Sequence, residues 1–160
     1  MTTPKDGPIE KSGEWRKFCD WNGRNDTESS KVLYRPEYAL MTGDTSCGIL
    51  LAQVVYWFGY SKSGDLRAVL IDGKDEKLYH CETDADMGDQ LGLTHDQVRR
   101  ARRVLHELGL VDTRIGGFSG RKTVFYKLNS QEFAHDFRLV RKGQLDRRRH
   151  RTSQSEANNV

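Results

Sequence analysis

The sequence predicts a mostly α-helical α+β domain with one small antiparallel β-hairpin. Three observations support this fold class. Residues 49–58 are apolar except for Gln53, and a run of that length favours a buried helix over a strand. Residues 94–108 repeat apolar side chains at helical spacing, whereas residues 121–128 alternate with the two-residue period of a strand.

Length and composition bound the organisation of the chain. Its 160 residues are 36% hydrophobic and 31% charged, which fits one domain with polar extensions. We expect a flexible N-terminal arm over 1–30, a folded domain over 31–137 and a basic, disordered tail over 138–160. No apolar run reaches the roughly 20 residues of a membrane span, and no secretion signal opens the sequence.

The three cysteines are far apart and form no CxxC pair, and the histidines form no pair at ligand spacing. We therefore expect a cytoplasmic protein with no disulfide scaffold, no metal site and no cofactor. We also expect no catalytic activity, because the sequence holds no Gly-rich phosphate loop, HExxH or GxSxG motif.

The predicted arm contains an aromatic segment whose role the sequence leaves open. Trp15, Phe18 and Cys19 share one face if the segment is helical. The segment either docks on the domain or anchors a protein partner through Trp15, Phe18 and Trp21.

The first part of the domain holds a buried helix and a β segment. Asp44, Thr45 or Ser46 can cap the helix over 49–58, although its β-branched and aromatic side chains leave a strand as the alternative. Residues 66–81 are predicted as a strand or a hairpin, because they alternate weakly around a turn signal.

Two consecutive helices follow, joined by a short turn. Thr83 can cap the first, and Gly92 ends it. Thr94 and Gln97 have the spacing of a capping box for the second, which Gly109 ends. One stripe of this second helix is apolar: Val98, Ala101, Leu105 and Leu108.

A β-hairpin and one more helix complete the domain. Residues 110–115 and 121–128 are predicted as antiparallel strands joined by a glycine-containing turn over 116–120. In the second strand, one face carries Val124, Tyr126 and Leu128. Residues 130–137 are predicted as a short helix.

The charge is unevenly distributed along the chain. Residues 1–93 carry 11 Lys/Arg and 16 Asp/Glu, whereas residues 94–128 carry 8 and 3 and residues 138–151 carry 7 and 1. This asymmetry indicates an anionic partner, such as nucleic acid, for the second half of the chain.

The order helix, turn, helix, hairpin over 82–128 resembles the winged helix-turn-helix domains that bind DNA. The similarity is carried by residues 91–105 and 108–111 and extends over about 31–130. Residues 33–57 also resemble the first helix of winged-helix domains in phage and plasmid replication proteins. The resemblance implies a double-stranded DNA-binding protein with a recognition helix over 94–108 in the major groove. It also implies a wing over 116–122 on the backbone or in the minor groove.

A helical projection of residues 94–108 also predicts that the outward face of this helix contacts DNA. Opposite the apolar stripe this face is mostly arginine, whose planar fork can grip guanine or phosphate with two hydrogen bonds. The residues predicted to contact DNA are Thr94, His95, Asp96, Gln97, Arg99, Arg100, Arg103, Arg121 and Lys122.

Three features of the sequence can each be interpreted in two ways. Arg102 lies near the edge of the core, and either joins this face or pairs with an acidic residue of the preceding helix such as Asp86 or Asp89. Phe118 either packs on the wing or touches a deoxyribose. The arginines over 147–151 either add phosphate affinity or only solubilise the chain.

Two biological roles remain open for a DNA-binding chain of this kind. One is a transcriptional regulator, and the other is a replication-origin-binding protein of a phage or plasmid. The alternative is a phage or mobile-element protein that uses the same fold to bind a protein partner. A homodimer is expected because one recognition helix reads few base pairs, and a DNA-bound form would be nucleoid-associated.

Overall fold

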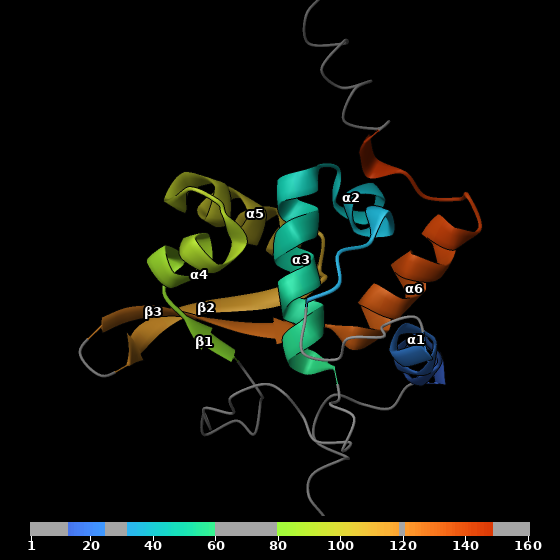
Figure 1. The fold of residues 1–160 in the computed structure, drawn as a ribbon, viewed down its shortest axis with the longest axis horizontal. Helices are drawn as coiled ribbons and strands as arrows, with labels where there is room; N and C mark the ends of the chain where they lie inside the picture. The colour runs from blue at the N-terminus through green and yellow to red at the C-terminus, as the bar shows by residue number, and fades with distance from the viewer. Residues whose placement is uncertain (1–12, 25–31, 60–79, 119–120, 149–160) are drawn as a thin grey trace, which may run out of the picture.

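The computed structural model describes residues 13–24, 32–59, 80–118 and 121–148 (Figure 1). This part of the chain folds into six helices and a three-stranded antiparallel sheet, which confirms the predicted α+β class. The elements in chain order are α1 (Gly13–Arg24), α2 (Pro36–Thr42), α3 (Thr45–Phe58), β1 (His80–Glu82), α4 (Asp84–Leu91), α5 (His95–Glu107), β2 (Val111–Phe118), β3 (Arg121–Leu128) and α6 (Ser130–Arg141).

Helix α3 runs through the middle of the fold and contacts α2, α5 and β3 (Figure 1). Leu50, Leu51 and Val54 are fully buried, which explains why the segment is apolar all round. Asp44 is its N-cap, and Oδ1 accepts a hydrogen bond from the Cys47 backbone amide at 2.9 Å. The helix prediction is therefore confirmed over the strand alternative.

The sheet has the order β1-β3-β2, so β3 is its central strand. Val124, Tyr126 and Leu128 join the hydrophobic core, as the alternation predicts. Of the predicted segment 66–81, residues 66–79 lie outside the described residues. His80–Glu82 forms β1, which pairs with β3.

The predicted turn over 116–120 is too long. Gly116 pairs with Thr123 and Gly117 with Lys122, so both glycines lie within the strand ladder. Gly116 serves the packing of the sheet, because a Cβ there would lie 3.0 Å from the Phe125 ring. Residues 119–120 and the side chain of Phe118 lie outside the described part.

The prediction of a flexible arm is wrong for Gly13–Arg24, which is a helix packed on α6. The interpretation that the aromatic segment docks on the domain is confirmed. Trp15 is 1% exposed, and the Phe18 ring lies 4.9 Å from Phe133 and 5.0 Å from Phe137. Aromatic burial of this extent outweighs the polar composition of the flanking sequence. The rest of the predicted arm, 1–12 and 25–30, lies outside the described residues.

The predicted boundary before the tail is also wrong. Helix α6 continues to Arg141 and ends in a left-handed Gly143, whose amide donates to the Val140 carbonyl. Beyond it, Arg147 pairs with Asp136 at 2.9 Å and donates to the Met41 carbonyl oxygen. Residues 138–148 thus pack on the domain, and residues 149–160 lie outside the described part.

Candidate nucleic-acid interface

The turn between α4 and α5 requires glycine at two positions. The Leu93 amide donates to the Gly88 carbonyl at 3.0 Å, and a Cβ on Gly88 would lie 2.6 Å from the Leu93 oxygen. Gly92 ends α4 in the left-handed conformation with φ of 69°. The two helices are therefore joined closely and at a fixed angle.

The start of α5 has the predicted capping box. The Thr94 hydroxyl accepts from the Gln97 amide at 3.2 Å, and Gln97 Oε1 accepts from the Thr94 amide at 2.9 Å. Both side chains are exposed, so the residues that fix the helix start also lie at its surface.

The rest of α5 divides into a buried stripe and an exposed face. Val98, Ala101 and Leu105 are fully buried against the core. Seven of the predicted residues are exposed at the N-cap and in the first turns of α5, and we call them the α5 surface: Thr94, His95, Asp96, Gln97, Arg99, Arg100 and Arg103. Of the two predicted residues on β3, Lys122 is exposed, and the side chain of Arg121 lies outside the described part.

Acidic side chains of α5 itself and of neighbouring elements hold two arginines of the α5 surface. Arg99 lies 3.4 Å from both Asp84 and Asp96, and Arg100 lies 2.5 Å from Asp44, the N-cap of α3. Arg103 is exposed and forms no ion pair within the described ranges. Arg103 is therefore the arginine of this face most available to a phosphate or a base.

Arg102 belongs to the interior edge of α5. Its Nη2 lies 3.1 Å from Asp84 Oδ2, and its side chain is only 14% exposed. The interpretation that Arg102 pairs with an acidic residue of the preceding helix is confirmed, but the partner is Asp84 in the first turn of α4. The two residues named as examples, Asp86 and Asp89, are exposed instead. Burial raises the pKa of the Tyr126 hydroxyl, an effect that the nearby Arg102 guanidinium partly offsets.

Three side-chain contacts of this region were not predicted from the sequence. Asp44 is 56 residues from Arg100 along the chain, and no local pattern relates the two. Arg114 on β2 is exposed, with its guanidinium carbon 5.2 Å from the centre of the Phe125 ring. Asn129 Nδ2 donates to the Gly109 carbonyl at 2.8 Å, which ties the base of the hairpin to the end of α5. Only the residue type of Asn129 could have suggested this contact from the sequence, because Asn side chains often hydrogen-bond to backbone groups.

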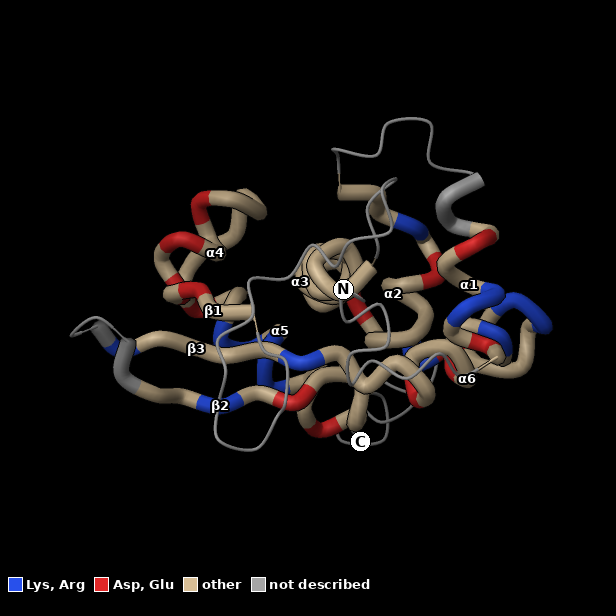
Figure 2. Tube along the Cα trace, turned by 90° about the horizontal axis from the view of Figure 1, so that it is seen from below, with Lys and Arg blue, Asp and Glu red and all other residues tan. Residues whose placement is uncertain are grey.

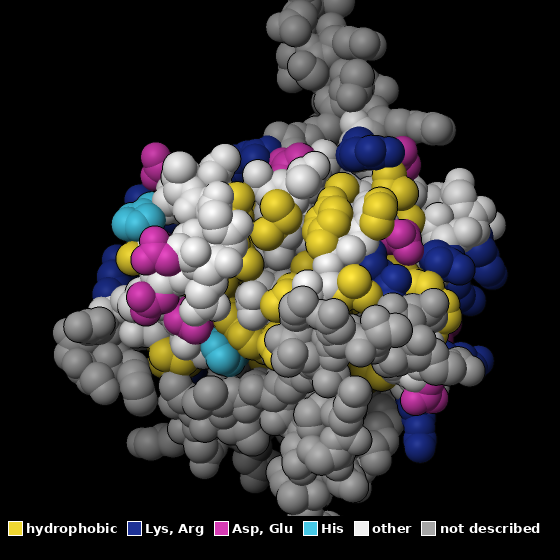
Figure 3. Space-filling model, in the orientation of Figure 1, with side chains coloured by type: hydrophobic (Ala, Val, Ile, Leu, Met, Phe, Trp, Pro, Cys, Tyr) yellow, Lys and Arg dark blue, Asp and Glu magenta, His cyan; other side chains and the backbone are white. Residues whose placement is uncertain are grey.

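Charge separates between neighbouring elements. Acidic residues lie on α4, whereas basic residues lie on α5 and again on α1 and α6 (Figure 2). Figure 3 shows acidic side chains along the edge where α4 lies and basic ones along the opposite edge, where α1 and α6 lie. The described part thus carries two basic regions on different elements.

Comparison with known proteins assigns no family: no family model, curated protein or solved structure matches this chain. Among the described residues, no helix is long and apolar enough to cross a membrane. The same residues contain no group of three or more His, Cys, Asp or Glu side chains placed to hold a metal ion.

Proposed function

We propose that this chain is a double-stranded DNA-binding protein built on a winged helix-turn-helix domain. In this proposal α4 and α5 are the helix-turn-helix, and α5 lies in the major groove. The β2–β3 hairpin is the wing, and its end over 116–122 lies on the backbone or in the minor groove. Strand β1 supports the assignment, because its pairing with β3 fixes the hairpin to the start of α4.

The exposed face of α5 is the single observation that carries the proposal. Arg99, Arg100 and Arg103 lie on that face, opposite a fully buried apolar stripe. A helix that presents arginines in its first turns fits the major groove, which admits a helix and offers paired acceptors on guanine. The α5 amino terminus also favours a nearby phosphate.

The ion pairs of the α5 surface are compatible with DNA binding. The side chains of Arg99 and Arg100 are 56% and 44% exposed, and ion pairs at such exposure contribute about 0–1 kcal/mol. A DNA phosphate can therefore replace the carboxylates at a small cost.

The same site serves either of two roles. A transcriptional regulator would occupy an operator, and an origin-binding protein of a phage or plasmid would occupy repeated sites. Both require sequence readout by α5, and a two-fold operator would require a homodimer. Selection from a random duplex pool at near-physiological salt separates them: a single palindrome indicates an operator, and repeated sites indicate an origin.

The test of DNA binding is the double variant Arg99→Ala with Arg103→Ala, measured against the selected duplex by fluorescence anisotropy. We expect about a 10- to 30-fold loss of affinity, most of it from Arg103, which has no ion pair to give up within the described ranges. The matched control is Arg16→Ala with Lys142→Ala, which removes the same charge from exposed positions on α1 and after α6. Equal affinities of the two double variants would refute the assignment.

A further inference from the structure

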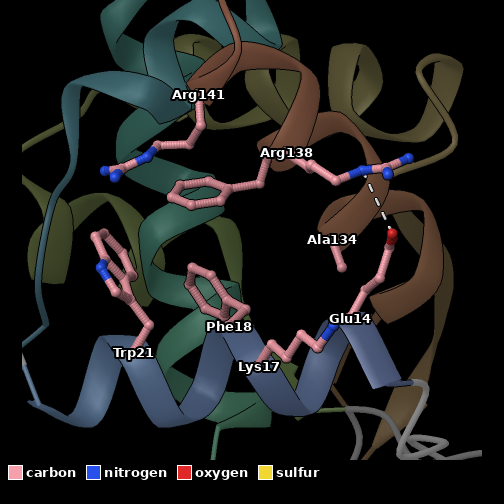
Figure 4. Close-up of a pocket in the computed structure, with 8 residues that line it drawn as sticks. Glu14, Lys17, Phe18, Trp21, Ala134, Arg138 and Arg141 are labelled. Carbon is pink, nitrogen blue, oxygen red and sulfur yellow. Dashed lines mark ion pairs between the residues drawn. The ribbon is translucent and has the colours of Figure 1, made fainter.

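The second basic region surrounds a groove between α1 and α6, far from the α5 surface in the fold (Figure 1). The groove encloses about 310 Å³. Its lining, which defines the α1–α6 groove, is Glu14, Lys17, Phe18, Trp21, Ala134, Phe137, Arg138 and Arg141. Figure 4 shows the aromatic side chains between the two helices and the charged side chains around them.

The floor of the groove is apolar and already packed. Phe18 stacks on Trp15 with ring centres 5.4 Å apart. The guanidinium carbons of Arg35 and Arg141 lie 4.0 and 4.9 Å from the centre of the Trp21 ring. A nucleobase would have to displace these contacts before it could stack. An apolar protein side chain needs only the hollow, which has room for one such side chain.

The rim of the groove is cationic. Three cations, Lys17, Arg138 and Arg141, and one anion, Glu14, line the groove, for a formal net charge of +2. Arg138 lies 3.3 Å from Glu14, and Arg141 lies 3.7 Å from Glu37 beside the groove.

These ion pairs leave the rim available to a partner. The side chains of Arg138 and Arg141 are 48% and 53% exposed, so both pairs can exchange with a partner's carboxylates. Lys17 is exposed and forms no ion pair within the described ranges.

We propose that the α1–α6 groove binds an acidic protein segment that inserts one apolar side chain. The apolar side chain would fill the hollow over Phe18 and Phe137, and flanking carboxylates would pair with the cations of the rim. The proposal is independent of DNA binding, because the groove and the α5 surface share no residue. It gives the chain a second surface, through which it could hold a partner protein while α5 lies on DNA.

The probe is the acetylated and amidated heptapeptide Asp-Asp-Glu-Leu-Phe-Glu-Asp, titrated into the uniformly ¹⁵N-labelled full chain at about 0.15 M salt. We expect saturable shifts of the Trp21 indole N–H and of α1 and α6 amides, with Kd of about 0.1–1 mM. The peptide with Asn and Gln in place of its acids, and the peptide with Ser in place of Leu and Phe, should each bind at least five-fold more weakly.

Two charge reversals on α1 localise the binding. Lys17→Glu acts on the rim, and we expect at least a five-fold loss of peptide affinity. Arg16→Glu makes the same charge change one residue away, at an exposed position outside the lining, and we expect a clearly smaller loss of peptide affinity than for Lys17→Glu.

Four results of the peptide titrations would overturn the proposal. They are an absence of shifts up to about 2 mM peptide, equal binding of the neutral peptide, equal losses in the two variants, and shifts confined to α5. A single-stranded oligothymidylate that moves the Trp21 signal at lower concentration than the peptide would also overturn it, and would assign the groove to nucleic acid.

Discussion

The guanidinium of Arg102 on α5 pairs with the carboxylate of Asp84 on α4, with Nη2 3.1 Å from Oδ2. Asp84 also accepts from Arg99, whose Nε lies 3.4 Å from the same oxygen. One carboxylate in the first turn of α4 therefore holds both an interior and an exterior arginine of α5. The angle between the two helices and the orientation of the α5 surface depend on the same residue.

The first prediction follows from the burial of this pair. The Arg102 side chain is only 14% exposed, and Asp84→Asn removes its counter-charge. We therefore expect a loss of about 1–3 kcal/mol in the free energy of unfolding. Urea unfolding followed by circular dichroism measures it. Asp86→Asn, which neutralises an exposed acid in the same turn, should cost less than about 0.5 kcal/mol. A cost for Asp86→Asn as large as that for Asp84→Asn would show that helix-dipole charge matters more than the ion pair.

Two arginines of the α5 surface should differ in their effect on DNA affinity. Arg103 has no ion pair within the described ranges, so Arg103→Ala removes one free contact and should weaken duplex binding about five- to ten-fold. Arg100 must first leave Asp44, so Arg100→Ala should weaken binding less than about three-fold while lowering the free energy of unfolding by up to about 1 kcal/mol. Fluorescence anisotropy and urea unfolding on the same preparations measure both, and the reverse order of affinities would contradict this account.

The salt dependence of DNA binding gives a count of phosphate contacts. If Arg99, Arg100, Arg103, Arg121 and Lys122 all neutralise phosphates, log K should fall against log salt with a slope of about −4 to −5 per monomer. Arg103→Ala should reduce the size of that slope by about 0.9 if Arg103 binds a phosphate, and by less if it reads a base. Titrations at four or more salt concentrations measure the slope, and a value near zero would exclude a phosphate-bound interface.

The turn between α4 and α5 should not tolerate a methyl group at Gly88. A Cβ there would lie 2.6 Å from the Leu93 carbonyl oxygen, so Gly88→Ala must push the turn away from α4. We expect a loss of about 2 kcal/mol or more in the free energy of unfolding, measured by urea. Gly13→Ala is the matched control, because its added Cβ would meet no other element of the described residues within 4 Å, and it should leave stability unchanged or raise it. A neutral Gly88→Ala would mean that the turn is not held as described.

The sequence predicted those parts of the fold that depend on local patterns. The capping box of Thr94 and Gln97 forms as its spacing indicates, and the stripe of Val98, Ala101 and Leu105 is the buried face of α5. Both patterns lie within one helix, where spacing alone fixes which side chains meet.

The errors concern contacts between segments that lie far apart along the chain. Phe18 meets Phe133 and Phe137, which lie more than 100 residues later, so a polar neighbourhood suggested a flexible arm where a helix docks. The Arg100 pair with Asp44 was missed for the same reason. Periodicity identified the α5 surface and the local pair of Arg99 with Asp96, but Asp44 and Asp84 come from the start of α3 and from α4, and only the packing of these helices brings them there.

The last prediction concerns His80, which stacks on Trp57 with ring centres 3.6 Å apart and is 7% exposed. Burial lowers the pKa of His80 below its ordinary value, and the Glu82 carboxylate, 3.5 Å from Nε2, offsets part of this effect. The unfolded chain therefore binds a proton more readily than the folded chain. The contribution of His80 to the free energy of unfolding is therefore fully present above its ordinary pKa of about 6.5. It is lost as the pH falls below that value and through the lower pKa of the folded state.

Urea unfolding at about pH 7.5 and about pH 5.5 tests this coupling. His80→Phe keeps a planar ring beside Trp57 but carries no titrating group, so its free energy of unfolding should fall less than that of the parent between the two pH values. His95→Gln removes an exposed histidine of α5 instead and should retain the pH dependence of the parent. If His80→Phe loses as much stability on acidification as the parent does, the destabilising proton binds elsewhere. The stack of His80 on Trp57 would then contribute to packing alone.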